Sequence, residues 1–499
     1  MRRLALPLLR AVACRRMVTV FRLSRVSIND ERESSSPPRG LFSPRFLWVT
    51  LGICLLVAVD AFETLAVTTI MPAVSKQLDG STLYAFAFAA PIALSLVGMV
   101  VAGFASDRGS VVAVLMISVG VFMVGSLAAG VAQTMEFFVA ARLVHVCAGG
   151  ALAVVLYVVI ARVYPAELHS RIFAATAAAW VLPSLVGPFI SGLAAQTVGW
   201  RWVFVGSVVL TGVAVLLVLP ALRVVRAGGG PSPEHPRSLW PLLWAMLLAS
   251  GILALSAAAE SQGVARWGVV AVASIVTVVA VRPLVPRGTL RAVRGLPSVI
   301  MIRAVTAGGF SAAEVYVPLM LVTFYGESPA QAGFALTAGG LTWAGAAWVQ
   351  GKFPRMSDRL TAVCASIFMG IAMLSLMCAA VVTVPVVVIM VGWSFAGAGM
   401  GIVSPRLGSA TLAHSTTFNQ GFNSSALNIA YSAGAALVLA LTALVSSVFG
   451  GTTGRGGFLA IFVTTGILCV VSLWLAPRIG EVSELLNGVD TELSQNANA

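Results

Sequence analysis

Long apolar runs recur along almost the whole chain, and they restrict the possible folds more than any other feature of the sequence. Each run has about 20 residues or more, the length that an α-helix needs to cross a hydrocarbon core of about 30 Å. Polar interruptions separate fourteen such runs. They predict membrane-spanning helices over residues 46–74, 84–105, 111–132, 136–161, 171–195, 200–222, 239–258, 267–285, 298–324, 329–350, 360–383, 385–405, 419–447 and 456–476.

The composition agrees with a lipid environment. Hydrophobic residues make up 59% of the 499 residues, charged residues make up only 10%, and the mean hydropathy is +0.96. A soluble globular domain carries about 25% charged residues. We therefore expect an all-α polytopic membrane protein, with the lipid bilayer as one of its partners.

Two longer segments rich in Pro, Gly and Arg interrupt the otherwise tight turns, one after the sixth run and one after the eighth. They divide the chain into six, two and six helices. The predicted regions are a basic N-terminal extension (1–45), an N-terminal six-helix bundle (46–222), linkers with two additional helices (223–297), a C-terminal six-helix bundle (298–476) and a tail (477–499).

The distribution of Lys and Arg predicts the orientation of the chain in the membrane. Of the 31 Lys and Arg residues, 25 fall on the side of the N-terminus, four fall in turns on the opposite side, and two lie within spans. Because Lys and Arg are retained on the cytoplasmic side of short loops, both termini are expected in the cytoplasm. The net charge of +13 then follows from topology and from attraction to anionic lipid, without a nucleic-acid partner.

The first 45 residues are Arg-rich and contain no acid before Asp30. Arg10 and the pair Arg15–Arg16 interrupt their apolar stretches, which argues against a secretory signal. We expect a basic cytoplasmic extension that is disordered or lies on the membrane surface. A start site at Met17 and a transit peptide are the alternatives.

Two carboxylates, Asp60 and Glu63, lie inside the first run. At about 100° per residue, their side chains are about 60° apart on the helix and share one face. An ionised carboxylate in lipid costs several kcal/mol, so this face must contact protein or a water-filled cavity. Burial and mutual repulsion favour at least one proton on the pair near neutral pH, as a proton-coupled carrier requires. In the structural alternative, Glu63 only bonds to a neighbouring helix and Asp60 lies in a turn.

Arg142, in the fourth run, is the expected counter-charge, because a guanidinium stays protonated and must find an acid or carbonyl groups in the membrane. In the predicted topology it lies at the depth of the carboxylate face, and His145, one turn later, could join the contact. Glu314, in the ninth run, is a second candidate for proton or cation handling, or else a structural hydrogen-bonding group. Arg303 is a poor partner for it, since eleven residues of one helix separate them by about 16 Å.

The six cysteines and four histidines are dispersed, with no spacing typical of a zinc site or a redox pair. We therefore expect no metal and no cofactor. The sequence also offers no convergent set of catalytic groups and no long external loop, so we do not expect an enzyme.

The turn after the second run, "GFASDRGS" (103–110), resembles the signature loop of the major facilitator superfamily, G-x-x-x-D-R-x-G-[RK]-[RK]. Ser110 replaces its second glycine. The matching residues are Gly103, Asp107 and Arg108. The corresponding turn of the second half repeats the acid and the base at Asp358 and Arg359, as two related six-helix halves imply. In that family the loop holds the cytoplasmic gate through charge pairs and helix-end contacts, and the resemblance gives these residues that role.

Two further stretches resemble motifs of the same family. The fourth run resembles R-x-x-Q-G at Arg142, with His145 and Val146 in the places of Gln and Gly. The stretch "LPSLVGPFISGLAAQTVGWRWVF" (182–204) resembles the motif G-x-x-x-G-P-x-x-G-G of exporters that exchange drug for proton. Its matching residues are Gly187, Pro188 and Gly192. Because glycines permit close helix approach and a proline bends a helix, we expect a hinge-like seam between the halves.

The resemblance covers about residues 46–480, and six, two and six helices are the pattern of the fourteen-helix drug/proton antiporter branch. It implies a major facilitator fold and a proton-coupled exporter of amphiphilic or lipophilic compounds that works by alternating access. The proton-coupling candidates are Asp60, Glu63, Arg142 and Glu314. Polarity or aromaticity within spans marks the candidates for the substrate cavity, which are Phe62, Tyr316, Trp343 and Asn428.

A proton symporter that imports a small solute is the main alternative function, and a non-transporting sensor or channel is another. The motif in the fifth span favours export. The chain contains two lysines, Lys76 and Lys352, and 29 arginines. Ala, Val and Gly are abundant, and this composition is typical of high-GC bacteria. We therefore expect a monomer in the plasma (inner) membrane of such a bacterium, with protons and a small-molecule substrate as partners.

Overall fold

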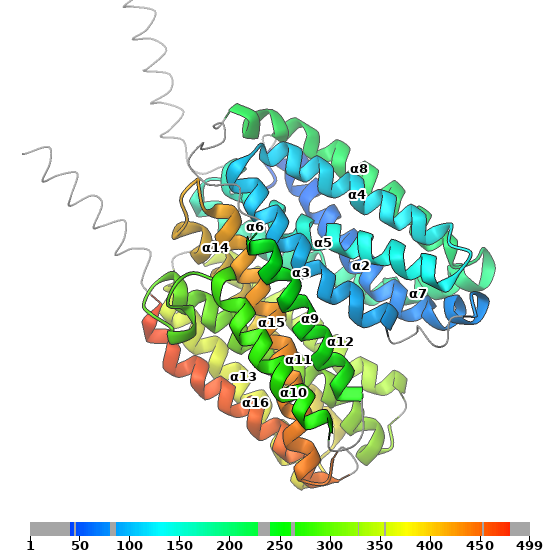
Figure 1. The fold of residues 1–499 in the computed structure, drawn as a ribbon. Coiled ribbons are helices and arrows are strands. Elements are labelled where there is room, and N and C mark those ends of the chain that lie inside the picture. The colour runs from blue at the N-terminus through cyan, green and yellow to red at the C-terminus, as the bar shows by residue number, and fades with distance from the viewer. Residues whose placement is uncertain are drawn as a thin grey trace, which may run out of the picture. The chain divides into compact units, whose positions relative to one another are not determined.

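The computed structural model describes residues 40–43, 46–79, 86–227, 240–260, 265–327, 329–353, 356–451 and 454–479. All regular structure in these residues is helical (Figure 1). The first helices are α2 (Leu47–Gln77), α3 (Phe86–Arg108), α4 (Val111–Gly130), α5 (Met135–Val163), α6 (Ala166–Ala178), α7 (Val181–Thr197) and α8 (Arg201–Ala227). They are followed by α9 (Trp240–Glu260), α10 (Ala265–Val281), α11 (Leu296–Tyr325), α12 (Pro329–Lys352), α13 (Asp358–Val381), α14 (Val386–Ala413), α15 (Gln420–Val448) and α16 (Arg455–Leu475).

Each of the fourteen predicted spans overlaps a helix of the structure, and the fifth, 171–195, is divided between α6 and α7. Within the described residues, ten helices are long and apolar enough to cross a membrane, or eleven if one bent pair counts as a single span. The chain is thus a multi-pass membrane protein. The count of fourteen spans and the cytoplasmic position of the termini stay predictions.

The predicted N-terminal extension and C-terminal tail lie largely outside the described ranges, as does most of the linker that follows α8. The division into two six-helix bundles and two additional helices also stays a prediction. For description only, α2 to α8 are called the first group of helices and α11 to α16 the second group.

The fifth predicted span is bent. Segments 166–184 and 189–197 meet at an angle of 41°. The four residues between them include Gly187 and Pro188. A proline removes one backbone hydrogen bond and its ring collides with the carbonyl group of the preceding turn, so a helix bends at such a position. The structure therefore has a bend at the exporter-like motif.

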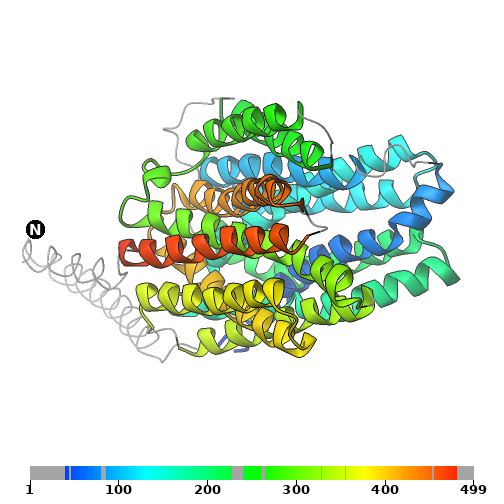
Figure 2. The ribbon, with the colours of Figure 1, turned by 90° about the horizontal axis from the view of Figure 1, so that it is seen from below.

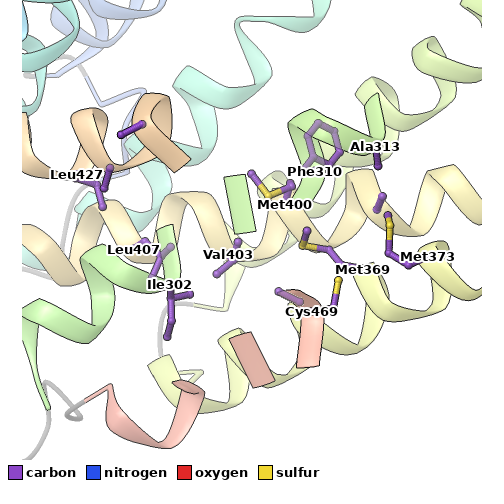
Figure 3. Close-up of a cluster of buried hydrophobic side chains, with 14 of the residues drawn as sticks. Ile302, Phe310, Ala313, Met369, Met373, Met400, Val403, Leu407, Leu427 and Cys469 are labelled. Carbon is purple, nitrogen blue, oxygen red and sulfur yellow. The ribbon is translucent and has the colours of Figure 1, made fainter. Parts of the chain in front are cut away.

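The second group of helices packs around a methionine-rich core. Helix α12 contacts α14, α13 contacts α14 and α16, and α11 contacts α15 and α16. Met369, Met373 and Met400 lie in this core with Phe310 of α11 and Cys469 of α16 (Figure 3). Methionine fills irregular gaps between helices because its side chain is unbranched and flexible. This core fixes the position of α11 against its neighbours.

Glycines lie where helices cross at short distance. A Cβ atom at Gly98 of α3 would overlap the carbonyl oxygen of Cys147 on α5, and one at Gly150 of α5 would overlap that of Ser95. Gly397 of α14 makes the same kind of backbone approach to α12. Helices in a bilayer associate through such close packing of small residues, because lipid supplies no hydrophobic force between them.

Helices α9 and α10 pack against each other and lie beside α15 (Figure 2). Helix α9 also contacts α3 of the first group. The pair therefore lies at the junction of the two groups. Direct contacts also join the groups, since α15 contacts α3 and α5, and α6 contacts α12 and α14.

Candidate functional site

Glu63 lies near the middle of α2 and is buried, with 2% of its surface exposed. One carboxylate oxygen, Oε1, accepts a hydrogen bond from Ser126 Oγ of α4 at 2.8 Å and another from Ser207 Oγ of α8. The two serine hydroxyls lie 3.0 Å apart. A single carboxylate oxygen thus connects three helices of the first group.

The other oxygen of Glu63, Oε2, faces α5. His145 Nε2 lies 2.7 Å from it, and Arg142 Nη1 lies 3.9 Å from it. Both residues are buried, with 7% of Arg142 and 2% of His145 exposed. Arg142 Nη1 also lies 3.0 Å from His145 Nδ1. The structure therefore brings Glu63, Arg142 and His145 together, in the contact that the sequence suggested.

The contact between Arg142 and His145 determines which imidazole nitrogen carries the hydrogen. A guanidinium can only donate, so Nδ1 of His145 accepts and has no hydrogen. The ring is then neutral, with its hydrogen on Nε2, the atom that faces Glu63. The Nε2 contact is short but is not directed as a hydrogen bond, so it acts mainly through electrostatic attraction. The three side chains form an ordered series from guanidinium to imidazole to carboxylate.

Asp60 lies one turn before Glu63 and is partly exposed. Its Oδ1 lies beside α5, because a Cβ atom at Gly149 would be 3.1 Å away from it. The carboxylate interacts electrostatically with His145, Glu63 and Arg142. Asp60 is inside α2 and not in a turn. The two acids share one helix face but differ in their surroundings, since protein encloses Glu63 while Asp60 keeps an accessible side.

The third candidate acid, Glu314, lies away from this network. It is an exposed residue of α11 and interacts electrostatically with Tyr431 of α15. Helices α11 and α15 belong to the second group, whereas Glu63 and Arg142 lie in the first. The structure thus separates the predicted proton-coupling residues into a buried network and one distant acid.

The four candidates for the substrate cavity come from both groups of helices. Phe62 of α2 is half-buried, whereas Tyr316 of α11 is 7% exposed and lies in the core of the second group. Trp343 of α12 packs edge-on against Phe310, with ring centroids 5.2 Å apart. Asn428 of α15 donates a hydrogen bond from Nδ2 to the carbonyl group one turn earlier, at 2.9 Å. Their role in binding stays a prediction.

Asp107, the acid of the predicted gate loop, bonds to the first turn of α15. Oδ1 accepts from the N–H of Gly421 at 2.6 Å, and Oδ2 accepts from the N–H of Phe422 at 2.7 Å. The first N–H groups of a helix have no partner within it, and the helix N-terminus carries partial positive charge, so a carboxylate is favourable there. Asp107 therefore caps a helix of the other group.

Two glycines allow this contact. A Cβ atom at Gly103 would lie 2.8 Å from the carbonyl oxygen of Gly421, and one at Gly421 would overlap the carbonyl oxygen of Gly103. The backbones of α3 and α15 thus meet directly. We call this end of the bundle, which contains the last turn of α3 and the first turn of α15, the gate end.

Neighbouring residues support the gate loop. The guanidinium of Arg108 lies over the ring of Phe104, 5.0 Å from its centroid, and Arg162 of α5 interacts electrostatically with Asp107. Ser110 begins the next helix, since its Oγ accepts a hydrogen bond from the N–H of Ala113 at 3.4 Å. Serine in place of the family's second glycine therefore has a structural role as the N-cap of α4.

The corresponding turn of the second group has a different arrangement. Asp358 pairs with Nε of Arg406 on α14, within the same group, and Arg359 is exposed. Near this turn, Ser170 of α6 donates a hydrogen bond to Gln350 of α12 at 2.7 Å. Two pairs of helices thus connect the groups at the gate end: α3 contacts α15, and α6 contacts α12.

The glycines of the exporter-like motif face α2. A Cβ atom at Gly187 would lie 3.4 Å from Cδ2 of Phe62, and one at Gly192 would lie 3.6 Å from Cγ2 of Thr69. Helix α7 also contacts α12 of the second group. A Cβ atom at either glycine would make only ordinary van der Waals contact with α2, and the seam between the halves stays a prediction, although α7 contacts both groups.

Sequence reasoning missed Ser126, Ser207 and Gly421. Serine is common in membrane helices and can bond to its own backbone, so its presence gives no signal of a carboxylate partner. Gly421 lies just inside a helix after a polar turn, and such a position is a weak signal of an anion-binding N-terminus. In the described part of the chain, no three His, Cys, Asp or Glu side chains converge to hold a metal ion.

The described residues contain ten or eleven apolar helices, a buried ion network and a loop that caps a helix across two groups. These features are typical of a multi-pass membrane protein with a polar interior. The chain belongs to the Major Facilitator Superfamily, whose sequence profile matches residues 53–439. The family and the fold point to a transporter and not to an enzyme.

A probable multidrug-efflux transporter of Mycobacterium tuberculosis (strain H37Rv) is 30% identical over 320 residues, which are 60% of this chain and 65% of that protein. The match thus spans less than two thirds of that relative's length. The solved structure of a proton:xylose symporter has a TM-score of 0.62 at 15% identity and covers 88% of this chain and 96% of its own. The solved structure of a human organic anion transporter has a TM-score of 0.61 at 14% identity. It covers 87% of this chain and 100% of its own. Both likenesses concern the fold alone.

Proposed function

We propose that this chain is a proton-coupled exporter that exchanges protons for amphiphilic or lipophilic small molecules by alternating access. The observation that carries the proposal is the buried network of Glu63, His145 and Arg142 with the partly exposed Asp60 beside it. Carboxylates at such depth are costly and mark ion or proton pathways. The name of the mycobacterial relative, a probable multidrug-efflux transporter, supports drug-like cargo.

The proton step follows from the different surroundings of the two acids. Asp60 has an accessible side, so it exchanges protons with water in the cavity first. Glu63 has no such access, so its proton comes through His145, 2.7 Å away: Nδ1 of the ring takes up a proton as Nε2 gives its own to the carboxylate, which requires that the contact between Nδ1 and Arg142 breaks first. A protonated Glu63 loses its attraction to Arg142, and the guanidinium then seeks another partner. Movement of α5 against α2 is the change that this would transmit.

The contacts of Asp107 with α15 and of α6 with α12 support a closed gate at the gate end. With the predicted orientation, this end faces the cytoplasm, and the arrangement corresponds to an outward-facing state. Protonation from outside would compete with cargo, and proton release inside would reset the carrier. We also propose that the chain has fourteen spans, as in the drug/proton antiporter branch, and that both termini lie in the cytoplasm. The carrier would act as a monomer in the plasma membrane of a high-GC bacterium.

A gradient-collapse experiment tests this function. Everted membrane vesicles are energised to an acidic interior, and a pH-sensitive dye reports the gradient while lipophilic cations, neutral amphiphiles and amphiphilic acids are added outside. We expect at least one compound to collapse the gradient with the wild-type protein and not with the Asp60→Asn/Glu63→Gln double variant. Proton exit driven by a compound added outside requires exchange, because a symporter would carry proton and solute in the same direction.

Glu136→Gln is the matched control, because Glu136 is an exposed acid at the start of α5. It should behave as the wild type. Collapse that persists in the double variant would show that other groups carry the proton. Absence of any response to the whole panel would favour the symporter or the sensor.

A further inference from the structure

Arg303 is a charged residue in the second group that the proton-coupling proposal does not use. It lies on α11, seven residues after the helix begins at Leu296. Its Nη1 donates a hydrogen bond to Ser404 Oγ of α14 at 2.7 Å, and its guanidinium lies over the ring of Tyr431 of α15, 4.6 Å from the centroid. Its Nε is buried without a hydrogen-bond partner.

This guanidinium has no carboxylate partner in the described residues. The ion pairs there join Glu63 to Arg142 and His145, and Asp358 to Arg406. Glu314 is on the same helix but eleven residues away, about 16 Å along the axis. A guanidinium remains charged under all physiological conditions, and an uncompensated charge at membrane depth is expensive. The two arginines thus differ: Arg142 is buried and faces a carboxylate, whereas Arg303 is partly exposed and faces none among the described residues.

The groups around Arg303 can bind an anion. Tyr431 is partly exposed, and Tyr157 of α5 interacts electrostatically with Arg303. Tyrosine and serine hydroxyls and guanidinium N–H groups are donors to a carboxylate, and such charge-assisted hydrogen bonds are about twice as strong as neutral ones. Arg303 thus meets the hydroxyl of Ser404 and the ring of Tyr431, whose own hydroxyl bonds with Ser311, and within the described chain no acid faces it at ion-pair distance.

The cluster is formed by residues of both groups of helices. Tyr157 belongs to the first group of helices, while Arg303, Ser404 and Tyr431 belong to three helices of the second. An α-helix rises about 1.5 Å per residue along its axis. Arg303 therefore lies about 10 Å along the axis from the start of α11, and Tyr431 lies about 16 Å along the axis from the start of α15. The cluster therefore lies between the groups, about two to three turns inward from the Asp107 contact at the gate end.

We propose that Arg303, with Ser404, Tyr431 and Tyr157, binds a carboxylate group of the cargo, so that the transported class is amphiphilic acids. This inference rests on the proposed function and specifies its substrate. The bound carboxylate supplies the counter-charge that Arg303 lacks among the described residues. Hydroxyl donors from both groups of helices would then contact the same anion. The affinity for the anion would therefore depend on the position of the first group of helices relative to the second.

Binding of one acid and its neutral ester tests the proposal without a proton gradient. The protein in nanodiscs of phosphatidylcholine is titrated with dansylaminoundecanoic acid and with its methyl ester, and dansyl fluorescence gives Kd. We expect the acid to bind the wild type about tenfold more tightly than the ester, since hydrogen bonds to charged groups carry that preference. Arg303→Gln should remove this preference and leave the Kd of the ester unchanged, and Arg303→Lys should retain part of it.

Arg455→Gln is the matched control, because Arg455 is an exposed arginine at the start of α16 that donates to the carbonyl of Val381. It should keep the preference for the acid. Equal binding of acid and ester by the wild type, or binding of neither, overturns the proposal, and so does equal weakening of both by Arg303→Gln. The vesicle experiment reports proton exchange and this titration reports anion binding, so failure of the proposed function is distinguished from failure of the anion site.

Discussion

An Arg142→Gln variant will be destabilised far more than any other arginine variant of the first group. Glutamine removes the charge that faces Glu63 at 3.9 Å and the donor that holds His145 Nδ1 at 3.0 Å. The carboxylate then stays buried without its cation, and breaking such a pair costs about 3–5 kcal/mol. Thermal unfolding of the purified protein, followed by tryptophan fluorescence, measures the loss.

A double-mutant cycle separates this pair from general packing. Glu63→Gln in the Arg142→Gln background removes the uncompensated charge, so the double variant should be more stable than Arg142→Gln alone. Arg201→Gln is the control, because Arg201 lies near a helix end and donates to the carbonyl of Ala132 at 2.8 Å. Additive losses in the double variant would contradict a direct interaction between Arg142 and Glu63.

The helices and the buried acid pair could be predicted from the sequence because each depends on local information. Apolar runs of sufficient length indicate the helices, and the spacing of Asp60 and Glu63 puts them on one face. An arginine in a span needs an acid, so Arg142 was a natural partner. The serines that complete the network could not be predicted, since their role depends on which faces of α4 and α8 meet α2.

The two charged residues of α11 show what tertiary contacts add to the sequence. Glu314 was a candidate because an acid in a span suggests proton handling, while Arg303 was considered only as its partner. The structure leaves Glu314 exposed and surrounds Arg303 with donors from three other helices. Contacts among α5, α11, α14 and α15 are long-range in sequence, so periodicity and motifs cannot reveal this cluster.

The gate loop shows a similar limit. The resemblance to the family loop predicted a gate role for Asp107 and Arg108, but not which group the carboxylate would meet. Its acceptor role toward the N–H groups of Gly421 and Phe422 involves backbone atoms, which every residue possesses. Backbone partners leave no signature in side-chain identity, and only the tertiary arrangement identifies them.

A Gly421→Val variant will open the gate end. A Cβ atom at this position overlaps the carbonyl oxygen of Gly103 and would lie 2.8 Å from Oδ1 of Asp107, so α3 and α15 must separate and the helix cap is lost. Ser425 is the reporter, because it is 4% exposed and its Cβ would lie 2.8 Å from a Cβ at Gly103. In a Ser425→Cys background in everted vesicles, a membrane-impermeant maleimide should label the thiol about tenfold faster, a shift of about 1.4 kcal/mol between closed and open states.

Asp107→Ala should raise the labelling rate in the same direction without a steric clash, because it removes two charge-assisted hydrogen bonds to the N-terminus of α15. Gly206→Val is the control for Gly421→Val, since a Cβ atom at Gly206 meets nothing within 4 Å. Labelling of the protein without Ser425→Cys gives the contribution of the native cysteines. If Gly421→Val accelerates labelling and Asp107→Ala does not, helix packing alone holds the gate end closed, and the carboxylate cap contributes nothing to it.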